Sequence, residues 1–229
     1  MKIIEHRPLK DVGPAVVQFI RIDPEDLTST LSDILTKLMN LSWLSNFDED
    51  FEIAAFTSRA NKTIEDINDK FSRCIDDNIT KDAGEYVVSE LAREAIVDKL
   101  NYLDIPLGEL LGKKKSGNPG FDFHSQNCQT DTIIFGESKY VATTTAYSTA
   151  LPQMVGFIQA SKDIEDLPEL KPFCSNAALR RAYNGNKGFA AAFSAKSTSS
   201  DSIINSIKKR ADFQSLLQYE EVILVAVNL

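Results

Sequence analysis

The sequence predicts an α/β protein with a mixed central sheet flanked by helices, because strand-length apolar runs alternate with helix-spaced apolar patterns. The clearest strand covers residues 222–227, a nearly all-apolar run that fits a buried strand. The clearest helix covers residues 84–102, where apolar side chains recur on one face. We expect one domain over residues 1–229, with 1–80 as an N-terminal strand and helix portion and 81–229 as its core.

The other elements follow from the same patterns. Residues 15–22 are β-branched and apolar and stop at Asp23-Pro24, which predicts a strand. Residues 62–82 are either an amphipathic helix or an ordered loop. The remaining predicted elements are strands at 51–56, 121–125, 132–142 and 188–195, helices at 24–44, 148–161, 177–183 and 201–217, an exposed connection at 108–120, and a loop around 168–172.

Charge sets a condition on any nucleic-acid function. The chain has 25 Lys and Arg residues against 33 Asp and Glu residues, a formal net charge of −8. Affinity for nucleic acid comes largely from basic side chains that neutralise phosphates. Binding would therefore need a local basic strip or a partner that delivers the substrate. Candidate strips are residues 113–115, Arg180 and Arg181 with Lys187, and residues 208–210.

Several classes of protein are disfavoured by residue counts and missing motifs. The three cysteines are far apart and form no Cys-x-x-Cys pair, so neither a disulfide framework nor a zinc site is predicted. Two histidines give little support to a Ser-His-Asp hydrolase, and the sequence contains no phosphate-binding loop of the Gly-x-x-x-x-Gly-Lys type. Because no apolar run approaches the roughly 20 residues of a membrane span and no secretory signal is seen, we expect a cytoplasmic protein that does not contact the membrane.

The predicted hairpin over residues 121–142 brings polar side chains together. Glu137 and Lys139 are two residues apart on a strand, so they project to the same side. A hairpin centred between residues 129 and 130 places Asp122 opposite Glu137, with Cβ atoms roughly 5 Å apart. Asp131 is the rival carboxylate, but six residues of extended chain separate it from Glu137 by about 20 Å. We therefore favour Asp122.

Two carboxylates and a lysine supply the groups that phosphodiester hydrolysis requires. Mg²⁺ commonly binds one or two carboxylates, and a bound cation polarises a phosphate and activates water. We interpret Asp122 and Glu137 as ligands of Mg²⁺, with Mn²⁺ as an alternative, and Lys139 as a group that stabilises negative charge. A second Glu-x-Lys sequence, Glu169 to Lys171, lies between prolines and is predicted to be a loop without this role.

The order of these motifs, with Gly120-Phe-Asp122, then Glu137-Ser-Lys139, and a helix on either side, resembles the PD-(D/E)xK nuclease superfamily. The resemblance implies a restriction-endonuclease-like core and a glutamate from the preceding helix, either Glu85 or Glu90, with Glu90 slightly favoured. Gln153, followed one turn later by a phenylalanine, is similar to the Gln-x-x-x-Tyr helix of RecB-like members, where tyrosine stands in place of the phenylalanine.

Residues 80–229 are more closely similar to the HamA family, the nuclease component of the Hachiman antiphage defence systems of bacteria, whereas residues 1–80 match only in layout. This resemblance implies a DNase effector controlled by a helicase partner, HamB, and released when the helicase meets damaged or phage-modified DNA. Two alternatives stay open at this point. One is a sequence-specific restriction endonuclease on the same fold, and the other is a catalytically silent module that docks on a helicase or nucleoprotein.

Overall fold

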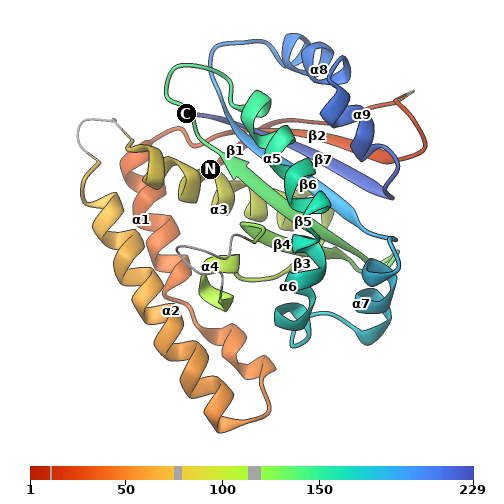
Figure 1. Ribbon diagram of the computed structural model, residues 1–229. Helices are drawn as coiled ribbons and strands as arrows, with labels where there is room; N and C mark the ends of the chain where they lie inside the picture. The colour runs from red at the N-terminus through yellow and green to blue at the C-terminus, as the bar shows by residue number, and fades with distance from the viewer. Residues whose placement is uncertain (11, 75–78, 113–119) are drawn as a thin grey trace.

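The computed structural model describes residues 1–10, 12–74, 79–112 and 120–229. Within these residues, seven strands form one mixed sheet in the order β1-β2-β7-β6-β5-β4-β3 (Figure 1). The pairs β2–β7, β7–β6 and β6–β5 run parallel. The pairs β1–β2, β5–β4 and β4–β3 run antiparallel. The strands are β1 (Lys2–Pro8), β2 (Val16–Asp23), β3 (Leu103–Asp104), β4 (Phe123–Asn127), β5 (Thr132–Lys139), β6 (Gly188–Ala195) and β7 (Glu221–Asn228).

Helices cover both faces of this sheet (Figure 1), which confirms the predicted α/β class with a mixed, helix-flanked sheet. Helix α3 lies on one face, and α5 and α7 pack against the other. Within the described ranges, no helix is both long enough and apolar enough to cross a membrane. The helices are α1 (Leu27–Leu38), the 3-10 helix η1 (Ser42–Asn46), α2 (Asp50–Phe71), α3 (Lys81–Leu100), α4 (Gly108–Leu111), α5 (Tyr147–Gln159), α6 (Lys162–Leu170), α7 (Asn176–Tyr183), α8 (Ser200–Lys208) and α9 (Ala211–Leu216).

Side chains of β5 alternate between two apolar layers. Ile133 and Phe135 pack in the layer that contains Leu151 of α5, whereas Ile134 packs in the layer that contains Leu91 of α3. The three β5 side chains are fully buried. Burial of each contributes roughly 1.5–3 kcal/mol, so both faces of the strand fix its position.

The prediction of a strand at residues 51–56 is wrong, because these residues belong to α2. The buried positions of α2 are Ala60, Thr63, Ile67 and Phe71, and their spacing of three to four residues is that of a helix. Taken alone, the aromatic and β-branched side chains of residues 51–56 favour a strand. The helical spacing of the buried residues that follow in α2 shows that the whole segment is a helix. Residues 62–71, for which a helix and a loop were both open, are helical.

Three further expectations need correction. Residues 168–170 lie in α6 rather than in a loop, because Leu167 and Leu170 pack on the core despite Pro168. Residues 108–111 form the short helix α4 with buried leucines, while residues 113–119 lie outside the described part. The helix predicted over 201–217 is two helices, because the backbone is extended at Arg210. Strand β1, the outermost strand beside β2, was missing from the predicted elements.

A glycine-to-alanine exchange in α3 tests how tightly this helix packs on the sheet. Alanine normally stabilises a helix interior by about 1 kcal/mol relative to glycine. At Gly84, however, a Cβ would lie 2.3 Å from Cγ of Tyr140, a buried ring just after β5. We expect Gly84→Ala to lower the free energy of unfolding by roughly 1–3 kcal/mol, measured by urea denaturation.

Gly156 of α5 is the matched control, because a Cβ there meets nothing within 4 Å. We expect Gly156→Ala to raise the free energy of unfolding by up to about 1 kcal/mol. Equal effects of the two exchanges would contradict the close contact between α3 and Tyr140.

Candidate active site

The candidate site lies at the start of β4, beside the last residues of β5. Phe123 pairs with Gly136, and the N–H of Asp122 donates to the Gly136 carbonyl at 2.8 Å. The predicted hairpin register is confirmed as far as Phe123, and Asp122 lies one residue beyond this last pair, where its N–H bonds to the Gly136 carbonyl rather than to Glu137. Upstream the chain turns away, since the N–H of Phe121 donates to Asp166 Oδ2 at 3.1 Å instead of pairing with β5. The last residues of β5 therefore have one edge that pairs with no strand, and side chains can bind there.

The carboxylate of Asp122 occupies this edge. Its Oδ2 accepts hydrogen bonds from the backbone N–H of Ser138 at 2.7 Å and from the Ser138 hydroxyl at 2.6 Å. Asp122 is 8% exposed. The rival carboxylate, Asp131, lies in the turn between β4 and β5, with a left-handed φ of 54°. It accepts a hydrogen bond from Gln126 Nε2 at 3.1 Å. The structure thus brings Asp122 beside Glu137 and leaves Asp131 remote from it.

Glu137 and Lys139 project from β5 to the same side, as their spacing predicts. Lys139 Nζ lies 2.8 Å from Glu137 Oε1 and 3.8 Å from Glu85 Oε1 of α3. The Glu137 side chain is 1% exposed and the Lys139 side chain is 11% exposed. A largely buried lysine is thus held among carboxylates from a strand and a helix.

The pKa of Lys139 reflects two opposing effects. Burial lowers it, but attraction by Glu137, Asp122 and Glu85, with a hydrogen bond to Glu137, outweighs burial. The pKa is therefore raised above its ordinary value of 10.5. Lys139 is an ammonium ion at neutral pH, which suits the stabilisation of negative charge and does not suit the role of a base.

A cleft of about 300 Å³ opens at these residues and is lined by side chains from α2, α3, α4, β5 and α5. Helix α5 contributes Gln153, the predicted site residue, and Phe157 one turn later. The Phe157 ring packs edge-on against Phe121 with centroids 5.5 Å apart. The cleft is lined by Lys70, Asp82, Glu85, Tyr86, Ser89, Glu109, Asp122, Glu137, Lys139, Gln153 and Phe157.

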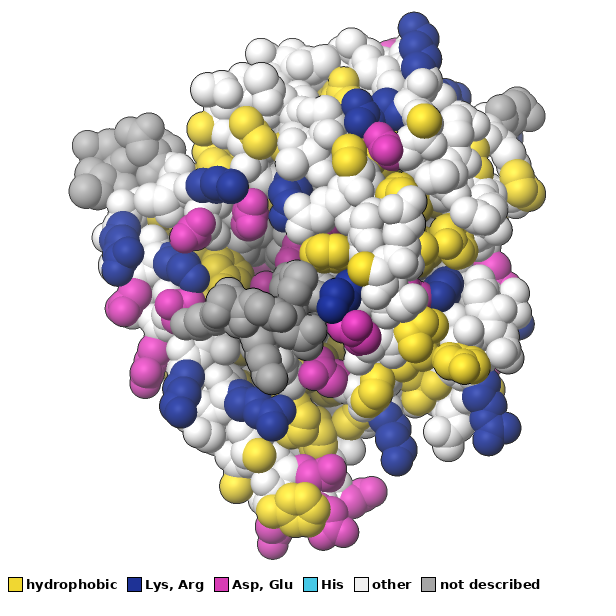
Figure 2. All heavy atoms as spheres, viewed as in Figure 1, with side chains coloured by type: hydrophobic (Ala, Val, Ile, Leu, Met, Phe, Trp, Pro, Cys, Tyr) yellow, Lys and Arg dark blue, Asp and Glu magenta, His cyan; other side chains and the backbone are white. Residues whose placement is uncertain are grey.

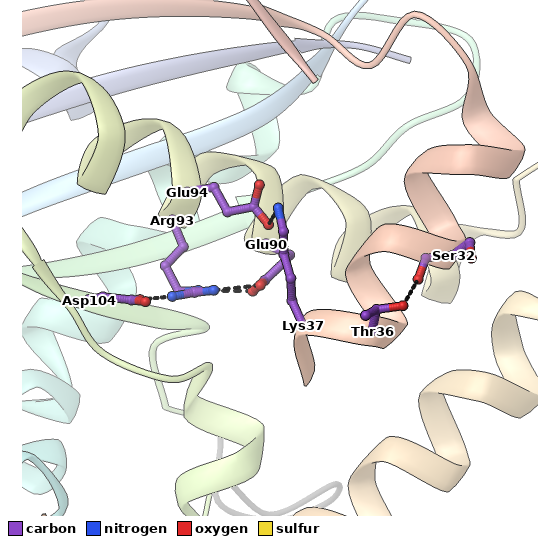
Figure 3. A network of polar contacts seen from close by, with 7 residues as sticks. All are labelled: Ser32, Thr36, Lys37, Glu90, Arg93, Glu94 and Asp104. Carbon is purple, nitrogen blue, oxygen red and sulfur yellow. Dashed lines mark hydrogen bonds and ion pairs between the residues drawn. The ribbon is translucent and has the colours of Figure 1, made fainter. Parts of the chain in front are cut away.

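Of the two candidate helix glutamates, the structure brings Glu85 to this cleft and not Glu90. Five residues along a helix correspond to a rotation of about 140° from the starting direction, so the two side chains point apart. Glu90 is 0% exposed and binds Arg93, with Oε2 at 2.9 Å from Nε and Oε1 at 2.5 Å from Nη2. Figure 3 shows Arg93 reaching on to Asp104 while Lys37 contacts Glu94 on the next turn. Glu90 belongs to an ion-pair network that links α3 to Asp104 of β3.

Two polar residues of the site were missed by sequence reasoning, Ser138 and Ser89. Their hydroxyl oxygens are 2.5 Å apart, and both side chains are buried. A signal for Ser138 was present, because its position on β5 alternates with Glu137 and Lys139 and so predicts a core-facing side chain. A polar residue at such a position needs a buried hydrogen-bond partner.

The donor set around Lys139 consists of carboxylate oxygens. Across residues 1–10, 12–74, 79–112 and 120–229, no group of three or more His, Cys, Asp and Glu residues is placed to hold a metal ion. Comparison with protein-family models, with curated proteins and with solved structures finds no match to this chain.

Replacement of Lys139 tests the electrostatic role of its ammonium. Removing one partner of a buried ion pair leaves an uncompensated charge, which typically costs about 3–5 kcal/mol. We expect Lys139→Met to lower the free energy of unfolding by about 3 kcal/mol, measured by urea denaturation in a chelator-containing buffer at neutral pH. Because the folded-state pKa is raised, the stabilisation by Lys139 is complete below pH 10.5 and is lost as the pH rises through the folded-state value.

Lys162→Met is the control, since Lys162 lies 2.6 Å from Glu165 and the two side chains are 16% and 48% exposed. An ion pair with one solvated partner contributes about 0–1 kcal/mol, so a smaller loss than at Lys139 is expected. A loss at Lys139 no larger than that at Lys162 would refute the buried-pair account.

Proposed function

We propose that this chain is a metal-dependent nuclease that hydrolyses phosphodiester bonds in DNA. The observation that carries the proposal is the position of Lys139 Nζ, 2.8 Å from Glu137 Oε1 in the cleft that Asp122 also lines. Its placement at the end of a hairpin strand, with a helix on each side, supports the resemblance to the PD-(D/E)xK nucleases. Glu85 replaces Glu90 as the proposed helix glutamate because it lines the cleft.

A hard divalent cation fits the donor chemistry of this cleft. Asp122 and Glu137 would hold Mg²⁺, or Mn²⁺ in its place, since oxygen ligands suit both and Mg²⁺ commonly uses one or two carboxylates. Three carboxylates, those of Glu137, Asp122 and Glu85, act on the single positive charge of Lys139. Negative charge is therefore in excess in this part of the cleft. When bound, the cation would polarise the scissile phosphate and make water a better nucleophile.

The protein side chains then have separate roles. In the hydrolysis, the water oxygen bonds to phosphorus, the ester P–O bond breaks, and a proton ends on the leaving oxygen. Lys139 stays protonated and stabilises the negative charge that builds up on the phosphate oxygens. Gln153, which lines the same cleft, would hydrogen bond with the substrate.

Delivery of DNA by a partner fits the charge of this chain. On the face in Figure 2, Lys and Arg side chains are interspersed with Asp and Glu rather than gathered in a strip. Among the candidate basic strips, Lys187 is buried against Asp163, and Arg181 pairs with Glu220 at 2.7 Å. The proposed partner is a helicase, HamB, and the proposed setting is antiphage defence. Both are supported by the resemblance to HamA.

Cleavage of plasmid DNA in Mg²⁺ tests the nuclease proposal, with the full chain alone and with its candidate helicase. We expect Asp122→Asn, Glu137→Gln and Lys139→Met each to reduce the cleavage rate by roughly 100-fold or more, because each removes a cation ligand or a charge that stabilises the transition state. Chelator should abolish cleavage. Glu85→Gln should slow cleavage more than Glu90→Gln, with rates normalised to the folded fraction.

Lys171→Met in the second Glu-x-Lys sequence is the matched control, because Lys171 caps the end of α6 and does not line the cleft. It should cleave as the wild type does. A wild-type chain that never cuts DNA, with or without the helicase, would favour the catalytically silent docking module instead.

A further inference from the structure

The middle residue of the Glu137-Ser-Lys139 sequence makes contacts that the proposed reaction does not yet use. Ser138 projects from β5 toward α3, on the face opposite its two neighbours, and is 0% exposed. Its N–H and its hydroxyl both donate to the same atom, Oδ2 of Asp122, at 2.7 Å and 2.6 Å. Two bonds to one oxygen, from groups fixed on a central strand, restrict rotation of the Asp122 carboxylate.

The backbone bond explains why the carboxylate is found here. In the β4–β5 register, Phe121 would stand opposite Ser138, but Phe121 donates its N–H to Asp166 instead. The N–H of Ser138 therefore meets the Asp122 side chain in place of a β4 carbonyl. Asp122 thus continues the ladder by one hydrogen bond, and its orientation is coupled to the rigid sheet.

The hydroxyl of Ser138 has a second neighbour that sets its direction. Ser89 of α3 places its hydroxyl oxygen 2.5 Å from that of Ser138. A hydroxyl has one proton to donate, and an ionised carboxylate can only accept. With the Ser138 proton directed to Asp122, Ser89 must donate to Ser138. The result is a chain of hydrogen bonds from α3 through β5 to Asp122.

We infer that Ser138, supported by Ser89, is a positioning residue that orients the Asp122 carboxylate for divalent-cation binding. The inference rests on the proposed nuclease function. Groups that hydrogen bond to a metal ligand commonly change metal affinity or activity by about 10–100-fold when they are replaced. Alanine in place of Ser89 or Ser138 would pack equally well in the apolar layer beside α3. Core packing alone therefore does not explain why both residues carry a hydroxyl.

The inference is tested by isothermal titration calorimetry, in which MgCl₂ is added to the full-length protein in the absence of DNA. We expect Ser138→Ala to weaken Mg²⁺ binding by about 10–100-fold and Ser89→Ala to weaken it less, because Ser138 still donates to Asp122. The double variant should bind no more weakly than Ser138→Ala, since Ser89 acts through Ser138. Ser138→Thr, which keeps the hydroxyl, should bind more tightly than Ser138→Ala.

Ser125→Ala is the matched control, because Ser125 is also 0% exposed and its hydroxyl donates to the Leu103 carbonyl at 2.7 Å, away from Asp122. It should bind Mg²⁺ as the wild type does, and thermal melts should show that each variant is folded. Wild-type affinity in Ser138→Ala, or additive losses in the double variant, would overturn the inference. Should Ser138→Ala not fold, wild-type affinity in Ser89→Ala overturns it. If Asp122→Asn also binds Mg²⁺ like the wild type, the cation site of the proposed function fails as well.

Discussion

The backbone pairing of Phe123 with Gly136 is the constraint on which the candidate site depends. It places Asp122 beside Glu137 and sends the side chains of Glu137 and Lys139 into the cleft. Because side chains alternate between faces, a slip of one residue would turn both toward α3. Gly136 supports the register, since a Cβ there would lie 2.3 Å from the Phe123 ring. Packing of an aromatic side chain on one face thus helps to fix the positions of the charged side chains on the other.

Electrostatics at the end of β5 follow from this placement. Glu137 and Asp122 are buried carboxylates brought together by the hairpin, and Glu85 adds a third from α3. Lys139 compensates part of this charge and stays protonated as a result. A site that gathers excess negative charge in a cleft favours a divalent cation over an unaccompanied phosphate. The proposed function and the stability of the fold therefore depend on the same ionic contacts.

Sequence reasoning predicted the hairpin, its register and α3, because these depend on alternation and helical spacing within short segments. It missed α2 at residues 51–56, since strand-like side chains there are overridden by packing further along the helix. The choice between Glu85 and Glu90 depended on which face of α3 meets the sheet, and spacing within the helix does not specify that. The contacts of Ser138 with Ser89 join residues 49 positions apart and required the folded chain.

The most direct test of the account is a crystal of the wild-type chain soaked in Mn²⁺ and measured at a wavelength that gives an anomalous signal from manganese. We expect an anomalous peak within about 2–2.5 Å of carboxylate oxygens of both Asp122 and Glu137. Loss of the peak in Glu137→Gln crystals would confirm the assignment. Manganese bound only at other residues, or no peak in a wild-type crystal that keeps the cleft open to solvent, would contradict a metal-dependent centre at this site.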